Sequence, residues 1–217
     1  MPKTEIVEAK KQEIKKAETE TPQLVISASD IEISKINLIQ KSSTIEGAVG
    51  SFVLDQQHEL LEAGETAEVV VVNAVKSWRE NIPYESDEMP RIASTIEEKE
   101  AIEAESEYGT IEFAEITLLI PKPDKEGTDE AVYPYPIGDE HFALGRINVA
   151  KDAYRMTYKR LATFSLFNED LPVGHRLWTI KGEVMTKGKY SWFAPSLSIT
   201  KNSPSDEVKT FISRLTV

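Results

Sequence analysis

The side chains that could carry out catalysis are few and widely spaced. The three histidines lie far apart in the sequence and cysteine is absent, so neither a zinc site nor a cysteine nucleophile is expected. The chain contains neither the GxxxxGK[ST] pattern that cradles phosphates nor GxGxxG. Glu97, Glu98 and Glu103 leave a metal-dependent nuclease as an alternative, although such carboxylates usually form the solvated face of a helix. We therefore expect a protein that is not an enzyme and needs no metal or cofactor.

Basic residues and aromatic rings are interleaved between residues 146 and 193. This window holds nine lysines and arginines, eight aromatic residues and four acids. Cations neutralise phosphates and release counterions, and ring faces accept unstacked bases, so the pattern is typical of a surface that binds a single nucleic-acid strand. We predict that the binding residues are Arg146, Lys151, Arg155, Tyr158, Lys159, Arg160, Lys181, Lys187, Lys189, Tyr190 and Trp192.

Periodicity predicts how this window presents its side chains. Lys151, Arg155, Tyr158 and Lys159 have the i, i+4, i+7 and i+8 spacing of one helix face. A hairpin turn over 186–189 would carry basic residues at its tip. For each ring, the alternative to binding a base is packing in the core, and we favour core packing for Trp178 and Phe164. For the cations the alternative is an ordinary solvated helix face.

The two parts of the chain carry opposite net charge. The formal net charge is −12; residues 1–140 hold 13 basic and 31 acidic residues (−18), and residues 141–217 hold 12 and 6 (+6). Such asymmetry indicates a polyanion-binding surface in the basic part. The alternative is that the acids only maintain solubility and the basic stretch is coincidental.

The elements that must position these residues follow from the hydropathy pattern. Residues 1–23 are rich in Lys and Glu and predict a disordered charged tail. Residues 24–217 then form a single α+β nucleic-acid-binding domain. A Ser/Thr–Glu capping box predicts an acidic helix over 95–106, and further helices are expected over 150–167 and after residue 203. Strands are predicted within 24–39 and over 50–54, 69–78, 111–120, 141–149, 176–185 and 190–200.

About seven strands with two or three inserted or flanking helices, and no alternating βα rhythm, predict an antiparallel sheet or a small OB-like barrel. No apolar run reaches the roughly 18 residues that a membrane span needs, and the N-terminal residues lack the apolar stretch of a signal peptide. We expect a protein of the cytoplasm without a membrane partner.

The layout of several segments resembles phage-encoded single-stranded DNA-binding proteins. The segments are AKDAYRMTYKRL (150–161), GHRLWTIKGEVMTKGKYSWFAPSLSI (174–199), IQKSSTIEGAVGSFVLD (39–55) and VVVVNAVKSWREN (69–81). The resemblance spans about residues 30–200 and implies an OB-like β core whose concave face binds a single strand, in the cytoplasm of a phage host. The acidic C-terminal tail of that group is missing, because the chain ends in TFISRLTV. Recruitment of partners through such a tail is therefore in doubt.

Three functions remain open at this point. The first is non-catalytic binding of single-stranded DNA in phage replication or recombination, with replication or recombination proteins as further partners. The sequence leaves open whether the protein forms oligomers. The second is a phage virion or assembly protein that acts through protein–protein contacts. The third is the metal-dependent nuclease.

Overall fold

In the computed structural model, residues 32–83 and 86–215 are described. The tail predicted over residues 1–23, and the first residues of the domain predicted from residue 24, lie outside them. The strands are β1 (Ser34–Leu38), β2 (Phe52–Leu54), β3 (His58–Leu61), β4 (Ala67–Glu80), β5 (Ile92–Ala93), β6 (Thr110–Pro121), β7 (Tyr135–Ile137), β8 (Glu140–Ala150), β9 (Leu177–Lys187) and β10 (Tyr190–Ile199). The helices are α2 (Ile96–Glu105), α3 (Lys151–Met156), α4 (Tyr158–Phe167) and α5 (Asp206–Leu215), with short 3-10 turns η3 (Glu130–Val132) and η4 (Val173–His175).

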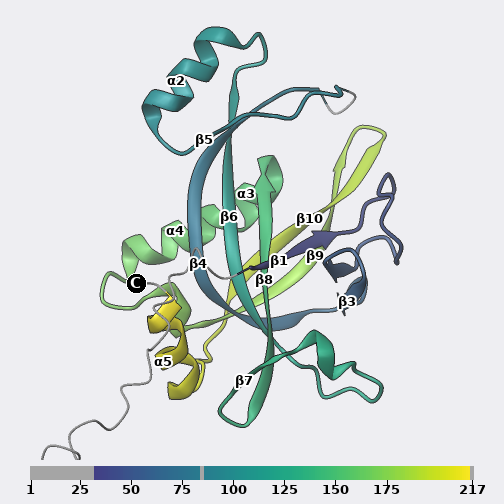
Figure 1. Cartoon of the computed structure of the whole chain (residues 1–217), viewed down its shortest axis with the longest axis vertical. Coiled ribbons are helices and arrows are strands. Elements are labelled where there is room, and N and C mark those ends of the chain that lie inside the picture. The colour runs from purple at the N-terminus through teal and green to yellow at the C-terminus, as the bar shows by residue number, and fades with distance from the viewer. Residues whose placement is uncertain (1–31, 84–85, 216–217) are drawn as a thin grey trace, which may run out of the picture. The chain divides into compact units, whose positions relative to one another are not determined.

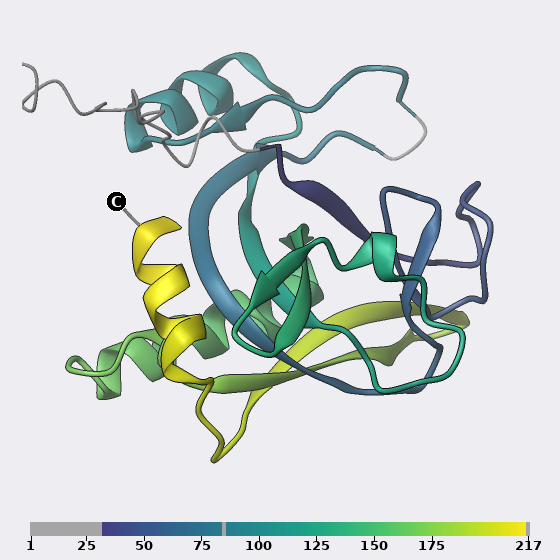
Figure 2. The same ribbon diagram turned by 60° about the horizontal axis from the view of Figure 1, so that its bottom comes forward.

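The strands form one curled sheet in the order β10-β9-β4-β6-β8-β1-β2-β3, with β5 added to β4 and β7 added to β8 (Figures 1 and 2). This confirms the predicted α+β class and its barrel-like sheet. Every pairing is antiparallel except that of β1 with β8. The sheet is therefore mixed, because β1 and β8 are far apart in the chain, need no hairpin and can pair in either direction.

The sheet curls around a core built from the inward faces of the long strands. β4 contributes Val69 and Val71, and β6 contributes Ile116 and Leu118, all fully buried. Gly145 of β8 lies where β1 crosses this core, and a Cβ there would come within 2.7 Å of the Ile36 side chain. The glycine therefore allows β1 to pack against β8. Buried side chains therefore fill the inner side of the curl.

Within the described part of the chain, side chains and not a further strand cap the free edge of β10. The Gln40 amide donates from Nε2 to the Phe193 carbonyl (3.0 Å), and its Oε1 accepts from the Phe193 backbone N–H (2.9 Å). Arg160 donates from Nη1 to the Leu197 carbonyl (2.8 Å). Pro195, which lies between these two positions, has no N–H to leave unpaired. We call the two bonds of Gln40 the edge latch, because they join the segment after β1 to the last strand of the sheet.

The helix predicted over 150–167 is broken. It consists of α3 and α4, which are separated by Thr157, whose φ of −121° and ψ of −82° are not helical. The Thr157 hydroxyl donates to the Ala153 carbonyl (2.6 Å) and competes with the regular helix there. Thr157 is fully buried. The single continuous helix face predicted for Lys151, Arg155, Tyr158 and Lys159 is therefore wrong.

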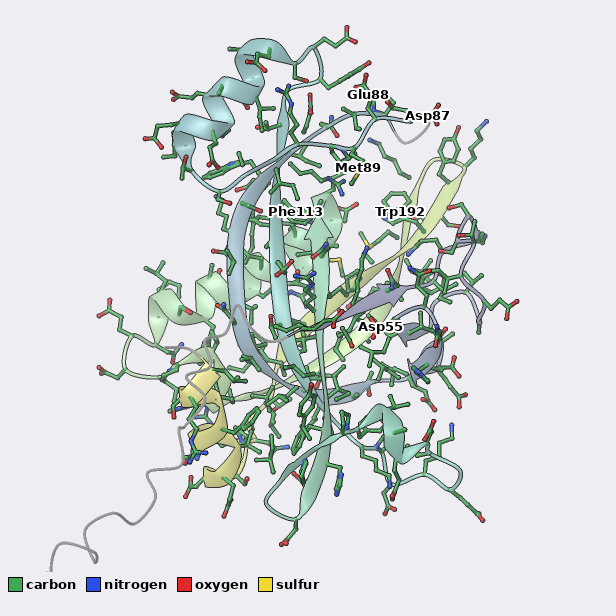
Figure 3. The ribbon with its side chains drawn as sticks, viewed as in Figure 1. Asp55, Asp87, Glu88, Met89, Phe113 and Trp192 are labelled. Carbon is green, nitrogen blue, oxygen red and sulfur yellow. The ribbon has the colours of Figure 1, made fainter. Side chains whose placement is uncertain are left out.

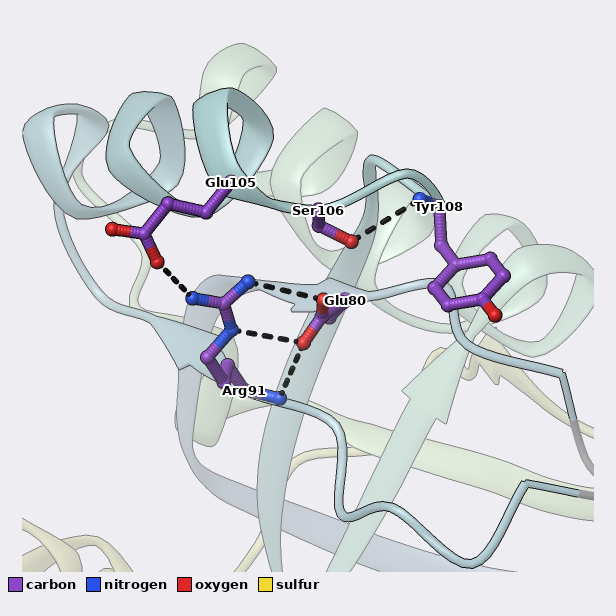
Figure 4. Close-up of polar contacts among 5 residues, drawn as sticks. All are labelled: Glu80, Arg91, Glu105, Ser106 and Tyr108. Carbon is purple, nitrogen blue, oxygen red and sulfur yellow. Dashed lines mark hydrogen bonds and ion pairs between the residues drawn. The ribbon is translucent and has the colours of Figure 1, made fainter.

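The predicted acidic helix is confirmed as α2, which Thr95 and Glu98 open with a complete capping box. It is anchored to the sheet by Arg91, just before β5, as Figure 4 shows. Arg91 donates from Nε to Glu80 Oε2 (3.0 Å), from Nη2 to Glu80 Oε1 (3.2 Å) and from Nη1 to Glu105 Oε2 (2.6 Å). The bonds from Arg91 to Glu80 are the main cause that lowers the pKa of Glu80 from 4.5 to about 2. We call residues 86–108 the acidic arm.

Candidate nucleic-acid interface

Helix α3 packs against β10, and an open groove of about 630 Å³ lies between α4 and the end of that strand. The lining contains three basic residues and no acidic one, in a chain whose net charge is −12. We call it the α4–β10 groove. Its lining residues are Arg155, Lys159, Arg160, Thr163, Phe164, Phe167, Asn168, Trp178, Leu197, Ser198 and Ile199.

The three groove cations are predicted site residues, and each is held by a different contact. Arg160 is fixed to the strand by its bond to the Leu197 carbonyl and by a second bond to Ser198 Oγ (3.1 Å). Lys159 Nζ lies 3.1 Å from Glu112 Oε2, on β6. Arg155 Nη2 lies 3.2 Å from Asp152 Oδ1, one turn earlier on α3. All three side chains remain exposed to solvent, so phosphates can reach them.

Aromatic rings form the apolar part of the groove. Trp178 is 2% exposed and donates from Nε1 to the Val173 carbonyl (3.0 Å), as expected of a core residue. Phe164 is half-buried and packs edge-on against Trp178, with ring centroids 5.5 Å apart. Phe167, at the end of α4, is 78% exposed. The groove therefore offers one ring that is free to stack on a base, next to two rings that are anchored in the protein.

A second group of predicted residues lies on the β9–β10 hairpin. The register pairs Tyr190 with Lys187, and Ser196 with Lys181. Because alternate residues of a strand share a face, these four residues and Trp192 lie on one face of the hairpin. Trp192 lies on the part of the hairpin near its turn (Figure 3). Lys181 lies on the face opposite Trp178, as predicted.

The hairpin tip collects cations around an exposed ring. Tyr190 is 67% exposed, and Lys189 Nζ lies 5.4 Å from its ring centroid, so the opposite face of the ring is the one available for stacking. Lys187 is exposed beside it. Lys41, from the segment after β1, reaches the same hairpin and donates to Ser191 Oγ (3.3 Å). Sequence reasoning missed Lys41, since nothing in the chain pattern places residue 41 beside residue 191.

Three predicted residues lie elsewhere. Arg146 is on the outer face of β8, with Nη1 3.3 Å from Glu115 Oε1. Tyr158 stacks on Tyr154 (centroids 5.0 Å apart) and lines a different cavity, between α4 and β4. Lys151 is exposed at the first residue of α3. The structure therefore gathers eight of the eleven predicted residues at the groove and on the hairpin face and tip, leaves Lys151 at the start of α3, and separates Arg146 and Tyr158 from them.

Carboxylates behind the groove already balance part of its charge. Glu112 lies between Lys159 and Lys76, whose Nζ is 3.2 Å from its Oε1, and the Lys159 contact is the main cause that lowers the Glu112 pKa. Glu183 accepts from Ser196 Oγ (2.8 Å) and pairs with Lys181 (3.2 Å), and these contacts lower the Glu183 pKa. A phosphate that enters the groove must therefore compete with internal anions.

Among the described residues, no three His, Asp or Glu side chains are grouped so that they could hold a metal ion. Glu97 and Glu98 are exposed on α2, and Glu103 is paired with Lys99 (2.7 Å). In the same part of the chain, no helix has both the length and the apolar character needed to cross a lipid bilayer.

No family model matches the sequence, and neither a curated protein nor a solved structure is significantly similar to it. The resemblance to phage single-stranded DNA-binding proteins therefore stays a prediction.

Proposed function

We propose that this chain is a non-catalytic single-stranded DNA-binding protein and that the α4–β10 groove is its contact surface. The observation that carries the proposal is the lining of the groove, which combines three cations with an exposed ring and excludes acids in a strongly acidic chain. Phage replication or recombination is the setting that the sequence resemblance implies.

Each part of the groove matches one part of a single strand. Arg155, Lys159 and Arg160 neutralise consecutive phosphates, and counterion release favours binding at low salt. Phe167 is exposed at the open end and stacks on an unpaired base, a contact worth about 1–3 kcal/mol. A duplex offers its phosphates but not its base faces, so the same groove discriminates against it.

The first prediction concerns Phe167. We expect the full chain to bind fluorescein-labelled dT16 with an affinity that falls steeply as salt rises, and Phe167→Ala to weaken binding about tenfold or more, as the loss of one stacked base implies. Leu166→Ala is the matched control, because Leu166 is adjacent, 69% exposed and not part of the groove lining. Fluorescence anisotropy measures both variants, with a dT16–dA16 duplex and U16 as comparison ligands.

An absence of binding to dT16 by the unmodified chain at micromolar concentration and low salt would rule out the proposal. Equal losses for the two variants would show that Phe167 is not a stacking ring.

The second candidate function is assembly through protein–protein contacts. It is favoured by two exposed apolar residues of the groove, Phe167 and Ile199, which is 48% exposed, because exposed apolar patches also serve protein interfaces. It predicts large oligomers in light scattering that form without nucleic acid and dissociate in Phe167→Ala.

A further inference from the structure

The groove and the hairpin tip lie at opposite ends of the same strand. Ser198 and Ile199, at one end of β10, line the groove, and Tyr190, at the other end, begins the tip. Nine residue steps separate Tyr190 from Ile199, which is about 30 Å at roughly 3.4 Å per residue. The two surfaces are therefore too far apart to contact the same nucleotide.

Helix α3 packs against β10, the strand that joins the two surfaces. Phe167 and Ile199 both line the groove, and Arg160 bonds the Leu197 carbonyl. Ala194 and Ser196, in the middle of β10, are buried. Lys151 and Arg155 of α3 are exposed.

The charge along this seam fits one extended polyanion. Exposed cations occur in the groove, on α3 and at the hairpin tip, and we call the whole the seam: Lys159, Arg160, Arg155, Lys151, Lys187 and Lys189. Exposed rings mark both of its ends, Phe167 and Tyr190. Two stacking positions with cations between them match a strand whose bases are free and whose phosphates are regularly spaced.

We infer that one single-stranded DNA molecule lies along the seam from Phe167 to the hairpin tip. The inference rests on the proposed function and adds a second contact site and a minimum length to it. A stacked strand rises about 3.4 Å per nucleotide along its axis, and an extended strand has longer steps, so a 30 Å seam holds at most about nine nucleotides. Oligonucleotides much shorter than this reach only one end.

The experiment compares oligonucleotide lengths with variants at either end of the seam. Anisotropy with labelled dT4, dT8, dT12 and dT16 measures the full chain, the double variant Lys187→Ala/Tyr190→Ala, and Phe167→Ala. We expect the affinity to rise with length and to level off by dT12. The tip variant should weaken binding of dT12 about tenfold and leave dT4, held in the groove, unchanged. Phe167→Ala should weaken both.

Val184→Ala is the control on the same hairpin, because Val184 is 61% exposed and lies on the opposite face from Tyr190 and Lys187. It should bind every length normally. No binding of any length by the unmodified chain would overturn the proposed function itself. Normal binding of dT12 by the tip variant, or equal losses for dT4 and dT12, would overturn the seam while leaving the groove in place. Thermal unfolding confirms that each variant is folded.

Discussion

At the scale of single residues, two of the three cations of the groove, Lys159 and Arg160, are held by partners that are distant in the sequence. Lys159 was predicted from its place among basic and aromatic neighbours, but Glu112, which pairs with it, lies on β6. Phe167 is distinguished from the other rings of its helix only by its exposure. Periodicity cannot supply either fact, because both depend on how α4 is placed against the sheet.

Removal of the Glu112 charge should strengthen DNA binding. Glu112→Gln keeps the shape of the side chain but frees Lys159 and Lys76 from their shared counterion, so we expect roughly two- to fivefold tighter binding of dT16, the range of a partly exposed ion pair. Glu115→Gln is the control, since Glu115 pairs with Arg146 on the outer face of the sheet. An equal gain in the control would mean that only total charge matters.

At the scale of elements, the strongest local patterns were predictive. The run of valines predicted β4, the capping box predicted α2, and the turn at 186–189 predicted the β9–β10 hairpin, and all three elements are present. The short strands β3 and β5 were not predicted, because strands of four and two residues carry too little pattern and form by pairing with longer ones. The break at Thr157 depends on tertiary packing that a helical periodicity does not record.

The acidic arm should lose its anchor in acid. The folded Glu80 has a pKa of about 2, below its ordinary 4.5, because Arg91 donates to its carboxylate, so its contribution to stability is present above pH 4.5 and is lost as the pH falls towards 2. We expect Arg91→Met to lower the melting temperature at pH 7, with a difference from the parent protein that shrinks by pH 2.5. Thermal unfolding by circular dichroism measures this.

Lys99→Met provides the comparison, because Lys99 pairs with Glu103 one turn along the same helix, α2. Its effect at pH 7 should be smaller than that of Arg91→Met. A loss of stability in Arg91→Met that is the same at both pH values would contradict the role of the Glu80 carboxylate.

At the scale of the whole molecule, the sheet order could not be read from the sequence. The barrel-like α+β class follows from the rhythm of strands, but the parallel pairing of β1 with β8 and the edge latch are long-range contacts. Gln40 and Phe193 are 153 residues apart, and neither has a local pattern that points to the other. The opposite net charges of the two parts of the chain were visible in the composition. The groove, whose lining has basic residues and no acidic ones, lies within the basic part.

Loss of the edge latch should destabilise the whole sheet. Gln40→Ala leaves the backbone N–H and carbonyl of Phe193 without their side-chain partner, which costs about 1–3 kcal/mol for groups that stay shielded from water. Lys41→Ala is the neighbouring control and removes only an exposed bond to Ser191. Urea unfolding measures both, and a control as unstable as Gln40→Ala would show that the latch is not a specific support.

The edge latch also has a consequence for biosynthesis. A ribosome that adds about 5–20 residues per second needs roughly 8–30 seconds to travel from codon 40 to codon 193. During that interval Gln40 has already been made, while the strand that it caps does not yet exist. Closure is therefore among the last steps of maturation, and a translation product that stops short of β10 carries an open sheet flank that invites intermolecular pairing.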